Sequence, residues 1–247
     1  MGLARVSPPK TIAALEPFAQ ELEAIHPALR FRISVRARRL ALRLDPKSGS
    51  IHLVVPKRAS LQKALEFAKQ YQDWIDRHAD NIQPAILFEH GTLIPVLGRE
   101  RLIAVTFNPA LKRTAITLTD DSLHVHTNKD DPSARIIRFL KNLARDEITR
   151  LAREKAATID RTITDIQIRD TKSRWGSCSP DGTLCFSWRL VLAPYESFDY
   201  VVAHEVAHLI HMNHKTRFWA LCEKLSTDFA TGHGWMKKNA QTLMRYG

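Results

Sequence analysis

The sequence predicts an α+β protein with a strand-rich N-terminal domain and a smaller C-terminal domain of helices and a sheet. The chain of 247 residues is 44% hydrophobic, which is enough for one large core or two small ones. Short alternating segments bounded by turn residues recur through residues 30–130, whereas long helical patterns surround two such segments in residues 131–247. We therefore expect an N-terminal extension at residues 1–29 and domains at 30–130 and 131–247.

The first strand region, residues 31–44, alternates arginine with apolar residues. Apolar residues occupy odd positions as far as Val35 and even positions from Leu40 onward. Because a strand alternates with a period of two, this shift predicts a break near Arg38 and Arg39. The charged face has two interpretations, a solvated edge that resists pairing with other chains and a face that binds a polyanion.

The rest of the first domain follows from turn and helix signals. The turn PKSGS leads into IHLVVP and predicts a hairpin, after which Ser60 can cap a helix that reaches Ile75. Proline and glycine interrupt residues 84–98, and further strands are predicted in 91–107, 114–119 and 122–127.

The second domain begins with Asp131 as a cap and Pro132 in the first turn of a long amphipathic helix. Residues 165–169 alternate as a strand, residues 173–183 hold turn residues, and residues 184–192 are interpreted as a second, more buried strand. A helical pattern then covers residues 199–211.

Composition limits the environment of the protein. The formal net charge of +11 has two interpretations. It indicates attraction to polyanions, which makes nucleic acid or nucleotides candidate partners, or it reflects simply a basic surface. No run of eighteen apolar residues and no secretory signal pattern is present, and the odd set of three cysteines forms no CxxC pair. We expect a cytoplasmic protein without a membrane span and with reduced cysteines.

Four histidines and one glutamate lie within VVAHEVAHLIHMNH, residues 201–214. His204 and His208 are four residues apart, which on a helix places both imidazoles on one face, about 6 Å apart along the axis. Such a pair can bind one Zn²⁺ and leave a position for water. Glu205 lies close enough to accept a proton from that water. The motif HExxH therefore predicts a catalytic zinc site.

The third metal ligand has three candidates. His211 would lie about 10.5 Å from His204 along a continuous helix, which is too far for a shared metal. His214 has the spacing of HExxHxxGxxH metalloproteases, where the chain leaves the helix before the last histidine. Since His211 replaces their glycine, we expect Asn213 to end the helix in a left-handed conformation. Spacing and ligand type favour His214 over Glu223, which lies on the following predicted helix.

Several segments together resemble the YgjP-like metallopeptidase family, which is related in its catalytic part to SprT-like proteins. These segments are HEVAHLIHMNHKTRFW, SRWGSCSPDGTLCFSWRLVLAP, RARRLALRL, GSIHLVVP and DWI, and the resemblance covers residues 30 to 245. It implies a zincin-like C-terminal domain. It also implies His204, His208 and His214 as metal ligands and Glu205 as the catalytic glutamate. Lys215 stands where the family carries serine.

We therefore expect a zinc-dependent metallohydrolase that acts on peptide or protein substrates. One alternative is a metal-dependent phosphate-ester or nucleotide hydrolase whose arginine-rich face holds phosphates, and another is a nucleic-acid-associated protease-like protein. The candidates for an electrophile opposite the metal are Arg174, Tyr195, Tyr200 and His233. The residues expected to pack in the core are Trp175, Trp188, Phe218, Trp219 and Met236.

Overall fold

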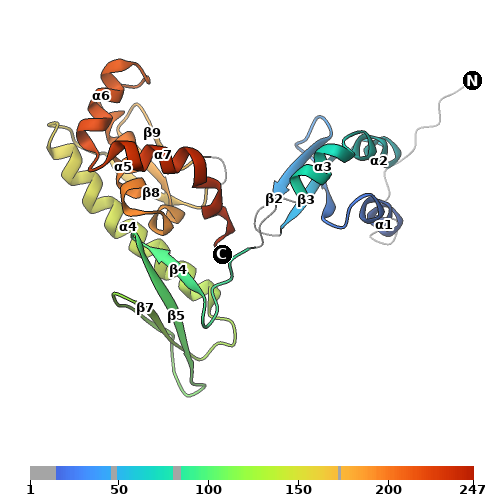
Figure 1. Ribbon diagram of the computed structural model, residues 1–247, viewed down its shortest axis with the longest axis horizontal. Coiled ribbons are helices and arrows are strands. Elements are labelled where there is room, and N and C mark those ends of the chain that lie inside the picture. The colour runs from blue at the N-terminus through green and yellow to red at the C-terminus, as the bar shows by residue number, and fades with distance from the viewer. Residues whose placement is uncertain (1–14, 46–48, 80–84, 172–173) are drawn as a thin grey trace, which may run out of the picture. The chain divides into compact units, whose positions relative to one another are not determined.

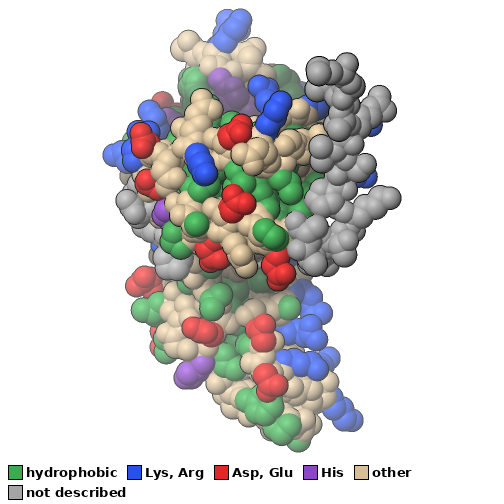
Figure 2. Space-filling view, turned by 90° about the vertical axis from the view of Figure 1, so that its right-hand side faces the viewer, with side chains coloured by type: hydrophobic (Ala, Val, Ile, Leu, Met, Phe, Trp, Pro, Cys, Tyr) green, Lys and Arg blue, Asp and Glu red, His purple; other side chains and the backbone are tan. Residues whose placement is uncertain are grey.

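The computed structural model describes residues 15–45, 49–79, 85–171 and 174–247. The chain forms two compact units, divided between Ala85 and Ile86. Each unit combines helices with small sheets, so the predicted α+β class is confirmed (Figure 1). On the surface, hydrophobic side chains are exposed between charged side chains of both signs (Figure 2).

The first unit contains a three-stranded sheet with the order β1-β3-β2. Strand β1 (Leu29–Ser34) runs parallel to β3 (Ser50–Pro56), and β2 (Ala41–Asp45) runs antiparallel to it. Helices α1 (Glu16–Ile25), α2 (Leu61–Gln70) and α3 (Gln72–Ala79) accompany the sheet. The buried residues of its core are Phe18, Leu22, Leu29, Ile51, Leu53, Val55, Ala64, Leu65, Ala68 and Ile75.

The arginine-rich segment breaks where its parity shifts. Bends at residues 35–36 and 38–39 separate β1 from β2, and the two strands lie on opposite sides of β3. The hairpin of β2 and β3 is also present, although the centre of its turn, residues 46–48, lies outside the described residues. The helix predicted from Ser60 to Ile75 is interrupted at Tyr71, and Ser60 makes no capping hydrogen bond through its side chain.

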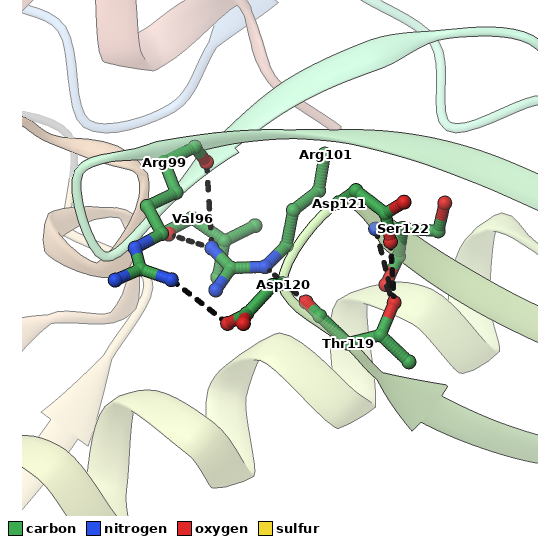
Figure 3. A network of polar contacts seen from close by, with 7 residues as sticks. All are labelled: Val96, Arg99, Arg101, Thr119, Asp120, Asp121 and Ser122. Carbon is green, nitrogen blue, oxygen red and sulfur yellow. Dashed lines mark hydrogen bonds and ion pairs between the residues drawn. The ribbon is translucent and has the colours of Figure 1, made fainter.

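The second unit begins with a four-stranded sheet. Its strands are β4 (Leu93–Val96), β5 (Arg99–Phe107), β6 (Ala115–Leu118) and β7 (Ser122–Thr127), in the order β4-β5-β7-β6. Leu97 and Gly98 both have positive φ, 51° and 78°, as the type I′ form of a two-residue hairpin turn requires. Buried Arg101 donates to the carbonyls of Val96 and Thr119, which ties the β4–β5 turn to the β6–β7 turn (Figure 3).

The expected boundary at residues 130/131 lies inside this second unit. Ile103 and Val125 of the sheet belong to the same buried core as Ile136 and Leu140 of α4 (Ser133–Ala157). The compact units are therefore divided at residues 85/86, because the four-stranded sheet packs with the helix that follows it. Within the expected extension at 1–29, α1 buries Phe18 in the core of the first unit, and residues 1–14 lie outside the described residues.

A second sheet and five further helices complete this unit in its described part. The sheet has the order β8-β10-β9, with β8 (Asp165–Arg169), β9 (Gly176–Cys178) and β10 (Thr183–Ser187). The helices are η2 (Trp188–Leu192), α5 (Tyr195–Ala207), α6 (Thr216–Leu225) and α7 (Phe229–Asn239), followed by the 3-10 helix η3 (Ala240–Arg245). None of the described helices is long and apolar enough to cross a membrane.

The strand predicted over residues 184–192 is wrong in its second half. Strand β10 ends at Ser187, and residues 188–192 form the buried 3-10 helix η2. A continuous apolar run has no periodicity that distinguishes a buried strand from a buried helical segment. The carbonyl of Val191 instead accepts a hydrogen bond from the N–H of Leu97 at 2.8 Å, which joins η2 to the β4–β5 turn.

A buried ion pair fixes α5 within this unit. The Nζ of Lys155 on α4 lies 2.6 Å from Oδ1 of Asp199 on α5, and their side chains are 10% and 1% exposed. Lys155 also donates to the carbonyl of Leu225, and Asp199 accepts from the N–H of Thr227. Because each charge has a partner, burial of the pair is tolerated, and α4, α5 and the end of α6 are held together.

Candidate metal centre

Helix α5 supplies the first two imidazoles of the site. His204 lies in its last turn, and His208 follows its last residue, Ala207. The Nδ1 of His208 forms a 2.9 Å hydrogen bond with the carbonyl of His211, which fixes the ring and leaves Nε2 for a ligand. His208 is 9% exposed, so its imidazole sits at the boundary between the core and the surface.

The segment between α5 and α6 brings a third imidazole back to this pair. The Nε2 of His214 lies 3.1 Å from the Nε2 of His204. One nitrogen from each of His204, His208 and His214 lies within 4.8 Å of the other two. Three nitrogens bound at about 2.1 Å to one tetrahedral metal would be about 3.4 Å apart. The three imidazoles therefore fit a single metal ion of this kind.

The return of His214 does not depend on a left-handed Asn213, and that expectation is wrong. The α-helix ends at Ala207 and turns through Ile210. Among the described non-glycine residues, only Leu97 and Asp160 have positive φ. The side chain of Asn213 instead accepts a hydrogen bond from the N–H of Lys215 at 3.3 Å, just before α6 begins. The helix therefore ends a full turn earlier than its apolar pattern suggested.

The other two candidate ligands lie outside the imidazole cluster. Within the part of the chain that the structure describes, the metal-sized group contains neither His211 nor Glu223. His211 contributes its backbone carbonyl to His208, and Glu223 is exposed on α6.

Two aromatic residues of α6 hold the imidazoles in place. The ring centroid of Phe218 lies 4.9, 4.5 and 4.7 Å from those of His204, His208 and His214. Trp219 lies 5.8 Å from His204 and 5.6 Å from His214. Core packing is confirmed for buried Trp188 and Phe218 and for partly buried Trp175, Trp219 and Met236. The sequence pattern gave no signal that Phe218 would contact all three rings.

Glu205, which follows His204 on α5, is buried, at 5% exposure. Burial raises the pKa of its carboxyl to about 8, because the carboxylate loses its hydration, and the charge of Arg174 opposes this rise. Gly176 of strand β9 packs against the side chain of Glu205. A Cβ atom added to Gly176 would lie 2.4 Å from Oε1 and 2.5 Å from Cγ of Glu205. Gly176, which sequence reasoning assigned only to a turn, is therefore the residue that makes room for this carboxylate.

The four candidate electrophiles occupy different places. The hydroxyl of Tyr200 lies 3.4 Å from Nδ1 of His204, and the ring of His233 on α7 lies 5.3 Å from that of Tyr200. Arg174 is exposed and acts on the charge of Glu205. Tyr195 lies at the other end of α5, where its Cβ would be 3.0 Å from a Cβ added to Gly98 in the β4–β5 turn. The structure therefore brings the first three toward the site and leaves Tyr195 out.

The metal-free protein should lose stability as the pH rises from 6.5 to 8. The carboxyl of Glu205 has a pKa of about 8 in the folded protein and about 4.3 in the unfolded chain. In this window the folded protein therefore retains a proton that the unfolded chain has already released. The free energy of unfolding then falls with pH, by at most about 1.4 kcal/mol per pH unit. The pKa values of His204, lowered to about 4, and of His208, also lowered, affect stability only below the unfolded value near 6.5.

Thermal unfolding of chelated protein at several pH values measures this effect. The matched control is Glu205→Gln, whose melting temperature should stay level over the same window. A wild-type melting temperature that rises between pH 6.5 and 8 would contradict a buried, protonated Glu205.

Three converging imidazoles could hold a metal ion, and comparison with known families gives the class of protein to which the chain belongs. A family model described as YgjP-like, metallopeptidase domain, matches residues 38–239. The chain therefore belongs to the YgjP-like family and is a metal-dependent peptidase by that membership.

Two further comparisons add little. No curated protein matches the chain. The crystal structure of the metallopeptidase zymogen of Pyrococcus abyssi abylysin is 21% identical, with a TM-score of 0.34, and the match covers 38% of this chain and 96% of that chain. At that TM-score the structural likeness supports no conclusion about the fold or the site.

Proposed function

We propose that the protein is a zinc-dependent peptidase in which His204, His208 and His214 bind the metal and Glu205 is the general base. The supporting observation is the convergence of three imidazole nitrogens within 4.8 Å, next to Glu205. A ligand set of histidines with a neighbouring glutamate is typical of catalytic zinc, whereas closed structural sites usually recruit cysteines. The second unit would then be the zincin-like part of the chain.

Each residue would have a separate task. Zinc, when bound, would polarise the scissile carbonyl and lower the pKa of a water molecule. The hydrogen bond from His208 to the carbonyl of His211 would keep its Nε2 directed at the metal. Glu205 would accept a proton from the attacking water and pass it to the leaving amine. His214 is exposed, so the site has a side that is open to a peptide.

The direct test is hydrolysis of an unstructured protein such as casein by purified enzyme, with zinc content measured on the same sample. We expect about one zinc per chain, loss of hydrolysis on chelation and its recovery when zinc is restored. Nucleoside triphosphates and a phosphate monoester serve as parallel substrates. Chelator-sensitive hydrolysis of a phosphate ester without cleavage of the protein would contradict the peptidase assignment.

Gly176→Ala should lower the hydrolytic rate although residue 176 binds no metal. The new methyl group would occupy the space of the Glu205 carboxylate, so that side chain has to move away from its present position. A displacement of about 1 Å in a reacting group commonly costs about 100-fold in rate. Zinc content should remain at the wild-type level.

The matched control is Gly234→Ala, because a Cβ atom added to Gly234 would meet nothing within 4 Å. Rates and zinc content are compared for the two variants and the wild type. Full activity of Gly176→Ala would show that Glu205 does not need its present position.

A further inference from the structure

A second concave site lies away from the imidazole cluster, where the four-stranded sheet meets the start of α4. It is an open pocket of about 650 Å³ lined by residues 112–116, by Asn128 and Lys129, and by Arg135 and Arg138. It shares no residue with the group of His204, His208 and His214. The sheet and α6 lie at opposite ends of the second unit (Figure 1).

Hydrogen bonds fix the walls of this pocket. Asn128 donates from its side chain to the carbonyl of Leu111 at 2.8 Å, which joins the segment after β7 to the segment before β6. The hydroxyls of Thr114 and Thr127 lie 2.8 Å apart, and the N–H of Lys129 bonds to the hydroxyl of Thr127 at 3.1 Å. Thr127 is fully buried. Hydrogen bonds therefore hold in place the backbone that carries the lining side chains.

The charge of the lining is of one sign. Five of the lining residues are cationic, namely Lys112, Arg113, Lys129, Arg135 and Arg138, and the lining contains no aspartate or glutamate. Within the described residues, none of these five forms an ion pair, whereas Arg99, Arg150 and Arg189 of the same unit each pair with a carboxylate. Lys and Arg side chains also gather along one edge of the lower part of Figure 2. Convergent cations without a counter-charge repel one another, and a bound anion would relieve this repulsion.

The lining also indicates which anion fits. Three guanidinium groups offer paired N–H donors that match the oxygens of a phosphate group. No aromatic ring belongs to the lining, so a nucleobase would find no surface on which to stack. A volume of about 650 Å³ is far larger than one phosphate needs and lies in the range of sites for small molecules.

We propose that this pocket binds anions that carry several linked phosphate groups, through their phosphate oxygens. Two sources share this chemistry, a free oligophosphate and the backbone of single-stranded nucleic acid. The proposal does not depend on the peptidase activity, since the pocket and the imidazole cluster have no residue in common.

The test measures binding of tripolyphosphate by isothermal calorimetry at low ionic strength, using full-length protein. The pocket variant is Arg135→Gln with Arg138→Gln. The matched control is Arg145→Gln with Arg153→Gln, which removes two exposed arginines from the same helix and leaves the net charge identical to that of the pocket variant. We expect the dissociation constant to rise at least about 10-fold in the pocket variant and less than about 2-fold in the control. Tripolyphosphate also chelates metals. Both variants retain the imidazole cluster, so heat from metal chelation is the same in both and cancels when they are compared.

A labelled single-stranded oligonucleotide provides the second arm. If the oligonucleotide binds the wild type, does not bind the pocket variant and is displaced by tripolyphosphate, nucleic acid is a source of the ligand. If only tripolyphosphate binds, the source is a free oligophosphate.

Three results would overturn the proposal. They are no binding of tripolyphosphate, equal losses in the pocket and control variants, and equally tight, pocket-dependent binding of polyglutamate. Lys112→Gln with Lys129→Gln is the replacement if the arginine variant does not fold, and circular dichroism checks the fold of each protein.

Discussion

Glu205→Gln is expected to lower the hydrolytic rate by about 100-fold or more, the usual scale for loss of a general base. Glutamine keeps the shape of the side chain against Gly176, but it cannot accept the proton of the attacking water. The substitution also removes a carboxyl whose pKa burial raises to about 8. At pH 8 the folded protein should therefore be as stable as the wild type or more stable, because no desolvated charge remains.

Zinc content, melting temperature and turnover of casein are measured on one preparation of Glu205→Gln. Full zinc content with a large loss of turnover would identify Glu205 as the general base and not as a metal ligand. Undiminished turnover with full zinc would instead assign proton transfer to another residue, and a loss of zinc would make Glu205 part of the metal site.

His214→Ala is expected to release the metal, and with it the hydrolytic activity, as completely as His208→Ala. His214 provides one of only three nitrogens in the described cluster, and removal of one leaves a two-histidine site that retains zinc poorly. The effect on activity should exceed about 100-fold in zinc-limited buffer, since no metal remains to polarise the carbonyl.

His211→Ala is the matched control. The contact that His211 makes with His208 uses its backbone carbonyl, which alanine retains. Zinc content after dialysis, and turnover at limiting zinc, should stay near the wild-type values for this variant. If His211→Ala strips the metal and His214→Ala does not, the proposed ligand set is wrong.

The sequence predicted those features of the site that depend on local spacing. His204 and His208 lie one turn apart on a helix whatever surrounds it, and Glu205 follows directly. The spacing also selected His214, although for a wrong local reason, because helix α5 ends at Ala207 without help from Asn213. The end of a buried helix depends on what packs against it, and a continuous apolar pattern does not record that.

The division into compact units and the conformation of residues 188–192 also depend on packing, which the sequence pattern does not record. Residues 93–127 have the alternating patterns of strands, and these patterns appear correctly as β4 to β7. Which helix covers the sheet depends on packing between residues far apart in the chain, such as Ile103, Val125 and Ile136, which belong to one buried core. For residues 188–192, an unbroken apolar run predicted burial and left the backbone conformation undetermined.

The sequence by itself therefore determined the α+β class, the spacing of the histidines and the family, because helical and strand periods and the spacing of side chains are properties of neighbouring residues. The tertiary structure decided the rest. It placed the backbone of Gly176 against Glu205, Phe218 against three imidazoles, and five cations around one pocket. Each of these joins separate elements of the fold. A side chain's burial, pKa and partners depend on which elements meet in space, and only packing of the whole unit settles that.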